Sequence, residues 1–323
     1  MKKLRLSLAV LLAICFVGGS TAAFGASLSL VTASTGGTYF AVGGVMASVL
    51  TKTVNGITIS ALASGGSVEN LNLLNVGEAD LALVMGPLAV DAWNGENAFS
   101  KKTQGFRCIG AVFPEVLCVI ASKESVATSI KGLAGKRVAI GAAGSGQATT
   151  MRLVFEAAGM NVDKDIKKHL DPYADAATKM QDGQLDAASI VNYSPSSSIM
   201  EISAVMPLNY ISLTKEELDV MAKIAPSYIG YTIPAGTYTN ETPVSTIASQ
   251  TAFVCRADLD EQTVYALTKA LYENADQIAA GHAAGADCKL ESALNGITTP
   301  IHPGAARYFK EKGLTVEPSL LVD

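Results

Sequence analysis

Three glycine-rich loops each follow an apolar segment and precede a helical pattern, so their residue types and spacing could bind an anion. They lie at residues 35–39 (TGGTY), 64–70 (SGGSVEN) and 141–147 (GAAGSGQ). The first turn of a helix offers unpaired N–H groups and about half a positive charge, and glycine lets a ligand approach the backbone. For any single loop, ordinary N-capping by Ser or Thr explains the pattern equally well. Three such loops at the carboxyl ends of strands favour a shared cleft for an anion.

Nucleotide and ester chemistry fit these loops poorly. Residues 141–146 have the glycine spacing of a Walker loop, but Gln147 and Ala148 stand where Lys and Ser/Thr would hold phosphate and magnesium. The order GxxGxG also differs from the GxGxxG fingerprint of dinucleotide-binding proteins. Ala143 and Gln147 break the GxSxG pattern around Ser145. We therefore expect a small carboxylate as the ligand, and no enzyme activity.

The composition excludes further classes. The chain of 323 residues carries 24 Lys and Arg against 29 Asp and Glu, a net charge of −5, and no basic run follows the first five residues. A nucleic-acid partner is not expected because phosphate neutralisation needs a basic surface. The three histidines, His169, His282 and His302, are far apart in sequence and match no metal-binding spacing, so no metal or other cofactor is expected.

The N-terminus has the pattern of a secretory signal. Basic residues within the first five positions precede an apolar run at 6–17 and a stretch of mostly small residues at 18–26. This predicts a signal peptide over residues 1–25, with cleavage after Ala23 or after Gly25. The apolar run is too short to span a bilayer. We therefore expect a periplasmic or otherwise extracytoplasmic protein.

Four cysteines follow the predicted signal peptide. An oxidising compartment permits disulfides, and four cysteines allow three full pairings, between which the sequence does not choose. Cys108, Cys118 and Cys255 lie in apolar, strand-like runs, where a cysteine is usually a small core residue. The pairing of these three and of Cys288 stays open at this point.

Apolar runs alternate with helical patterns along the chain, which predicts an α/β fold with parallel strands joined by helices. The expected strands are 28–32, 57–63, 81–85, 108–113, 116–121, 137–141, 187–192 and 251–256, and the expected helices are 39–53, 68–75, 148–158, 174–181 and 261–280. A pattern of helix, glycine, two residues, Asp and buried strand occurs at both 73–82 and 179–188. The repeat predicts two similar units.

Six motifs together resemble the TAXI family of TRAP-transporter substrate-binding proteins, and the match covers nearly the whole chain after residue 25. They are TGGTYF at 35–40, SGGSVEN at 64–70, FPEV at 113–116, GKRV at 135–138 with GSG at 144–146, TIPAGTY at 232–238 and HPGA at 302–305. The resemblance implies a type II periplasmic-binding-protein clamshell with the ligand between two lobes. We expect residues 26–113 plus 252–323 to form lobe 1 and residues 114–251 to form lobe 2.

The resemblance also implies where the ligand binds. The candidate ligand-binding residues are Gly37, Thr38, Tyr39, Gly66, Ser67, Met85, Glu115, Ser145, Gly146, Gln147, Asn192 and Tyr193. Two interpretations of Glu115 stay open: it binds an ammonium group of the ligand, or it bonds to the backbone at the hinge. No residue is expected to be catalytic or to bind a metal.

The implied function is transport. A relative of the TAXI proteins would capture a small organic acid, such as glutamate or a 2-oxo dicarboxylate, and deliver it to the sodium-coupled membrane subunits of a TRAP transporter. A monomer is expected. The alternative is an exported sensor that presents the bound solute to a membrane kinase.

Overall fold

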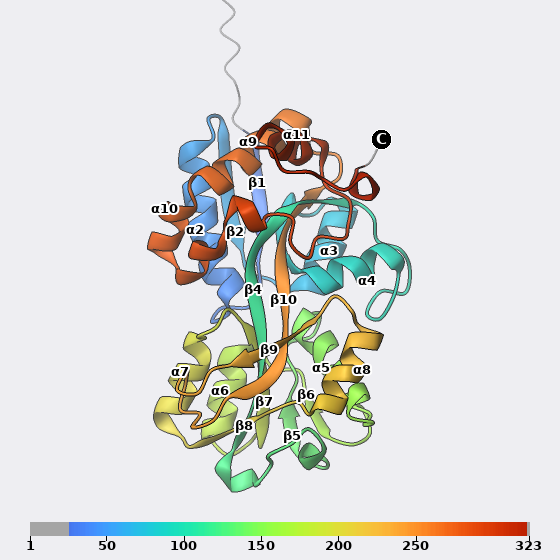
Figure 1. The fold of residues 1–323 in the computed structure, drawn as a ribbon. Helices are drawn as coiled ribbons and strands as arrows, with labels where there is room; N and C mark the ends of the chain where they lie inside the picture. Colours follow the sequence, from blue (N-terminus) through green and yellow to red (C-terminus); the bar gives the residue numbers. More distant parts are fainter. Residues whose placement is uncertain (1–25, 322–323) are drawn as a thin grey trace, which may run out of the picture.

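The computed structural model describes residues 26–321, and its chain forms two α/β lobes, one above the other in Figure 1. The α/β fold class predicted from the sequence is confirmed. The predicted signal peptide, residues 1–25, lies outside the described residues. Within residues 26–321, no helix is long and apolar enough to cross a membrane.

The upper lobe in Figure 1, called lobe 1, combines the N-terminal and C-terminal parts of the described chain. Its strands are β1 (Ala26–Val31), β2 (Ile57–Leu62) and β3 (Leu81–Met85). Its helices are α2 (Thr38–Thr53), α3 (Ser67–Val76), α4 (Gly86–Asn94), α9 (Glu261–Glu273), α10 (Ala275–Gly281) and α11 (Pro303–Glu311). The strands are parallel, as the alternation of strands and helices predicts.

The lower lobe in Figure 1, called lobe 2, comes from the middle of the chain. Its strands are β5 (Arg137–Ala139), β6 (Lys167–His169), β7 (Ala187–Asn192), β8 (Leu208–Ile211) and β9 (Ile229–Ile233). Its helices are α5 (Gly146–Ala157), α6 (Tyr173–Gln181), α7 (Ser197–Val205) and α8 (Lys215–Ile224). Here too the strands β5, β6 and β7 are parallel.

Two long strands, β4 (Phe106–Ser122) and β10 (Val244–Arg256), run through both lobes and pair antiparallel. They join the strands into one sheet of order β2-β1-β3-β10-β4-β7-β5-β6, with β8 paired to β4 and β9 to β10. The separate strands predicted at 108–113 and 116–121 are therefore one strand. Pro114 fits inside it because the pairing shifts register just beyond its partner Gln250, and proline is tolerated at such irregularities.

The predicted lobe boundaries, 113/114 and 251/252, fall inside β4 and β10. Because these strands belong to both lobes, the chain crosses between the lobes without a linker. The assignment of segments to lobes at these positions stays a prediction.

The helix predicted at 261–280 is wrong as a single element, because the chain breaks into α9 and α10 at Asn274. Asn274 leaves the helical conformation, with φ −120° and ψ 23°. Its side-chain amide donates to the backbone carbonyl of Ala270 at 2.8 Å, and its backbone carbonyl accepts from the backbone N–H of Gln277 at 3.0 Å. A short polar side chain that bonds locally to the backbone ends one helix and starts the next.

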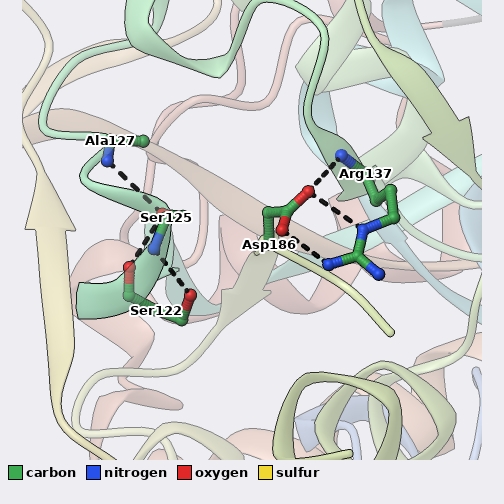
Figure 2. A network of polar contacts seen from close by, with 5 residues as sticks. All are labelled: Ser122, Ser125, Ala127, Arg137 and Asp186. Carbon is green, nitrogen blue, oxygen red and sulfur yellow. Dashed lines mark hydrogen bonds and ion pairs between the residues drawn. The ribbon is translucent and has the colours of Figure 1, made fainter. Parts of the chain in front are cut away.

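The repeated sequence pattern corresponds to the same contact in each lobe. In lobe 1, Asp80 accepts from the backbone N–H of Ser29 at 2.8 Å, which ties the start of β3 to β1. In lobe 2, Asp186 accepts from the backbone N–H of Arg137 at 2.7 Å and also forms an ion pair with its guanidinium, again at 2.7 Å (Figure 2). The Arg137 hydrogen bond lowers the pKa of Asp186. Each aspartate therefore aligns two parallel strands.

A serine turn follows the end of β4 at Ser122 (Figure 2). Ser125 donates its backbone N–H to Ser122 Oγ at 3.2 Å and its hydroxyl to the Ser122 carbonyl at 2.7 Å. The Ala127 N–H then donates to Ser125 Oγ at 3.3 Å. These bonds satisfy the backbone where the long strand gives way to a loop.

All four cysteines that the structure describes are free and buried: Cys108, Cys118, Cys255 and Cys288. Burial raises the pKa of the thiols of Cys108, Cys118 and Cys288 to about 12, so they stay protonated and unreactive at neutral pH. They fill space in the core, as the apolar runs around three of them predict.

Candidate functional site

A small cavity lies between the two lobes, with a volume of about 30 Å³. This volume offers space for one or two water molecules. Ten of the twelve predicted site residues line it: Gly37, Tyr39, Gly66, Ser67, Met85, Glu115, Ser145, Gly146, Gln147 and Asn192. The other lining residues are Ala33, Ser34, Gly65, Ala142, Pro172, Tyr173 and Val191. The three glycine loops therefore meet at one place, and none of the lining residues is Lys or Arg.

The other two predicted residues, Thr38 and Tyr193, lie next to this cavity on a separate hollow. The Thr38 N–H donates to Asn192 Oδ1 at 3.1 Å, and the Tyr193 N–H donates to Thr38 Oγ1 at 3.2 Å. Thr38 is the first residue of α2 in lobe 1, whereas Asn192 is the last residue of β7 in lobe 2 and Tyr193 comes directly after it. These residues connect the lobes beside the cavity rather than lining it.

Some of the backbone N–H groups in the first turns of α3 and α5 already donate to other groups of the protein. At the start of α3, the N–H groups of Val68 and Glu69 donate to the Gly144 carbonyl of lobe 2 at 3.1 and 3.2 Å. At the start of α5, Ser145 Oγ accepts from the Ala148 N–H at 3.1 Å. The glycine loops thus dock on each other as well as lining the cavity.

Other backbone donors remain free for a ligand. Among the described residues, the N–H groups of Ser67, Gly146 and Gln147 have no hydrogen-bond partner. All three residues belong to the first turn of a helix and line the cavity. Donors from α3 in lobe 1 and α5 in lobe 2 therefore face one space, where the positive ends of two helix dipoles favour an anion.

The side chains of Gln147 and Ser67 have structural partners. Gln147 Nε2 donates to the Ser189 carbonyl at 2.6 Å and to its hydroxyl at 3.0 Å, so the amide nitrogen is directed into lobe 2. Ser67 Oγ accepts from the Met85 N–H at 3.0 Å, which fixes the end of β3 to the start of α3. These two residues offer a ligand their backbone more than their side-chain polar groups.

Gly146 lies where the two lobes approach each other closely. A Cβ atom on Gly146, in lobe 2, would lie 2.5 Å from Met85 Sδ and 3.0 Å from Ser67 Oγ, both in lobe 1. Across the same gap, a Cβ atom on Gly37 would lie 3.0 Å from a ring carbon of Tyr173. The structure is therefore a closed form in which the lobes touch around the cavity.

Tyr173 lines the cavity but was not among the predicted residues. It is the first residue of α6, and its hydroxyl donates to the Val191 carbonyl at 2.7 Å. Burial raises the pKa of this phenol, so it stays neutral. No glycine motif marks its position, and the only sequence signal for it is an aromatic residue at the start of a helix.

Glu115 lies in β4, where the chain passes from one lobe to the other, and is only 4% exposed. The Tyr39 hydroxyl donates to its Oε2 at 2.5 Å. Burial raises the pKa of this carboxyl group to about 8, while the hydrogen bond from Tyr39 lowers it. Glu115 is therefore mainly protonated at neutral pH and brings little negative charge to the cavity.

The fold is that of the two-lobed type II periplasmic binding proteins. One similar structure is the binding protein component of an ABC phosphonate transporter from Pseudomonas aeruginosa, with 12% identity, a TM-score of 0.52, and 81% of this chain and 80% of that chain covered. Another is PhnD1 from Prochlorococcus marinus in complex with methylphosphonate, with 13% identity, a TM-score of 0.51, and coverage of 81% and 91%. A protein from Bordetella bronchiseptica RB50 is 18% identical, with a TM-score of 0.51 and coverage of 89% and 81%.

The chain belongs to the NMT1-like family, which matches residues 30–313. This range includes both lobes and every residue that lines the cavity.

Proposed function

We propose that this protein is an extracytoplasmic solute-binding protein that captures a small anion between its lobes and delivers it to a membrane transporter. The observation that carries the proposal is the convergence of unpaired N–H groups from Ser67, Gly146 and Gln147, out of both lobes, on one cavity without a basic side chain. The two phosphonate-binding neighbours support an anionic ligand. The cavity holds no set of nucleophile, base and acid, so binding rather than catalysis is proposed.

The resemblance to TAXI proteins supports a finer proposal: a small organic acid, such as glutamate or a 2-oxo dicarboxylate, passed to the membrane subunits of a TRAP transporter. The ABC-type neighbours offer the alternative of an ABC transporter.

Ligand-dependent thermal unfolding tests the proposal. A ligand that binds only the folded state stabilises it by RT ln(1 + [L]/Kd), so a binding anion raises Tm. We expect pyruvate, 2-oxoglutarate, glutamate or methylphosphonate to raise Tm, and sugars and neutral amides to leave it unchanged. A sugar that stabilises the protein while all anions leave Tm unchanged would refute an anion-binding function.

A further inference from the structure

We propose that Glu115 takes part in ligand binding as a neutral carboxylic acid that donates a hydrogen bond to the bound anion, so that the anion binds together with one proton. This inference rests on the proposed anion-binding function and names the chemistry by which the same site selects its ligand. It differs from both interpretations of Glu115 that the sequence leaves open, a contact with a ligand ammonium group and a bond to the backbone at the hinge.

The position of Glu115 leaves one of its oxygens for a ligand. The residue lines the cavity and pairs through β4 with Ser249 of β10. Tyr39, from the first turn of α2, donates its hydroxyl to Oε2. Because Oε2 already accepts a hydrogen bond, Oε1 is the oxygen that can carry the proton and donate it to an anion in the cavity.

The groups around Glu115 do not compensate a negative charge. Tyr39 of α2, Tyr173 of α6 and the more distant Tyr228 are neutral phenols. None of the residues that line the cavity is Lys, Arg or His. An ionised carboxylate needs a cation or several hydrogen-bond donors when it is buried to this extent.

Strand β10 adds two unsatisfied hydroxyl groups beside the carboxyl group. Ser249 Oγ and Thr251 Oγ1 are buried and have no hydrogen-bond partner of normal geometry among the described residues. Ser249 is the strand partner of Glu115, and the Thr251 hydroxyl lies close enough to lower the pKa of Glu115. Buried hydroxyls are normally hydrogen-bonded, so these two groups can share hydrogen bonds with the carboxyl group but bring no positive charge to it.

The free backbone N–H groups at the cavity favour a negatively charged ligand. The free N–H groups of Ser67 and Gly146 attract an anion, and an anion next to an ionised Glu115 would be repelled by it. Burial raises the pKa of Glu115 to about 8 without a ligand, and a neighbouring anion raises it further. The bound anion and the proton on Glu115 therefore stabilise each other.

This arrangement selects anions without an ammonium group. A 2-oxo acid or a simple carboxylate accepts a hydrogen bond from the protonated acid, and Glu115 keeps its proton. An amino acid would instead place an ammonium group against Glu115, which would ionise and release its proton on binding. The direction of proton movement thus separates the two ligand classes.

Calorimetric titration of the full chain without residues 1–25 tests this assignment, with pyruvate, 2-oxoglutarate and glutamate as probes. Pyruvate and 2-oxoglutarate have no group that titrates between about pH 6 and about pH 10, so a change in their affinity over this range reports on the protein. The amino group of glutamate loses its proton within this range, so glutamate is compared near neutral pH only. We expect the affinity of the wild-type protein for the 2-oxo acids to fall by up to about tenfold per pH unit as the pH rises from about 8, the pKa of Glu115 in the free protein, towards its higher pKa in the complex.

Two variants provide the comparison. Glu115→Gln keeps a donor and an acceptor but cannot ionise, so its affinity should stay constant over the same pH range. Glu217→Gln is the matched control, because Glu217 is also buried, at 6% exposed, but caps α8 and accepts from the Thr214 N–H at 2.8 Å. It should retain the pH dependence of the wild type.

The possible outcomes separate this inference from the proposed function. Binding of 2-oxo acids with pH-independent affinity, or glutamate bound most tightly with release of a proton, would overturn the role of Glu115 but leave anion binding intact. No binding of any anion at any pH would refute the proposed function itself. Infrared spectroscopy adds a ligand-independent test: a protonated carboxyl band at neutral pH should be present in the wild type and lost in Glu115→Gln, and its absence from the wild type contradicts the inference.

Discussion

A buried carboxyl group without a cationic partner makes the stability of the free protein depend on pH. The pKa of Glu115 rises from 4.5 to about 8 on folding, so the folded state binds one more proton than the unfolded state between these values. Protonated Glu115 makes its whole contribution to the free energy of unfolding below about pH 4.5. This contribution is lost as the pH rises from about 4.5 to about 8. The loss is on the order of a few kcal/mol.

Glu115→Gln should remove this pH dependence. Urea unfolding at about pH 5 and about pH 8 measures it: the wild type should lose more stability between the two pH values than the variant does. Equal losses in both proteins would show that Glu115 ionises normally in the folded state.

Gly146→Ala tests the close approach of the lobes. The new Cβ atom would lie 2.5 Å from Met85 Sδ in the closed form but touches nothing of lobe 1 once the lobes separate. We expect the affinity for the anion to fall at least tenfold, and the free energy of unfolding to change by less than about 1 kcal/mol.

Gly44→Ala is the matched control for this variant. Gly44 also lies in a helix, α2, where an added Cβ atom meets no atom within 4 Å. It should leave the affinity unchanged and raise the stability by about 0.5–1 kcal/mol, because alanine favours a helix interior more than glycine does. A Gly146→Ala variant with wild-type affinity would mean that ligand binding does not need the closed form.

At the scale of single residues the sequence predicts the glycine loops well, because each loop consists of residues adjacent in the chain. It does not predict how side chains are used within them. Gln147 is directed to Ser189, and Thr38 bonds to Asn192 across the lobes. Such partners are more than 40 positions away in sequence, so only the packed fold brings them together.

The paired aspartates that align parallel strands act at the scale of the element. Asp186 accepts the backbone N–H of Arg137 as well as its guanidinium, so Asp186→Ala leaves a strand donor without its partner. We expect a loss of about 1–3 kcal/mol in the free energy of unfolding, measured with urea. Asp219→Ala is the control: it removes only an exposed pair with Lys215 and should cost less than about 0.5 kcal/mol. Equal effects of the two variants would contradict the strand-aligning role.

The elements with strong apolar patterns follow from the sequence, whereas no prediction covered the helices α4, α7, α8 and α11 or the strands β6, β8 and β9. Helices and strands with a continuous apolar pattern, such as α2 and β7, lie where they are predicted. The break at Asn274 was missed because the apolar spacing continues across it. The continuity of β4 was missed because Pro114 is usually a strand breaker, and only its pairing with β10 shows that the strand continues.

For the whole molecule, the closed form predicts a change of shape on ligand binding. Donors from both lobes converge on the ligand only when the lobes touch, so the ligand must favour closure by its differential affinity. Solution X-ray scattering should give a smaller radius of gyration with saturating pyruvate or 2-oxoglutarate than without. The same ligand should reduce the radius of gyration of the Gly146→Ala variant by less than it reduces that of the wild type. Identical curves would count against closure, unless a distance between labels on the two lobes shows that the free protein is already closed.

The place of β10 in the sheet has a consequence for how the chain reaches its native state. This strand is among the last to be synthesised, yet it lies between β3 and β4 in the middle of the sheet. Until residues 244–256 have emerged, β3 and β4 have no partner between them, and lobe 1 cannot complete its core. We therefore expect this half of the molecule to complete its fold only after residues 244–256 have been synthesised.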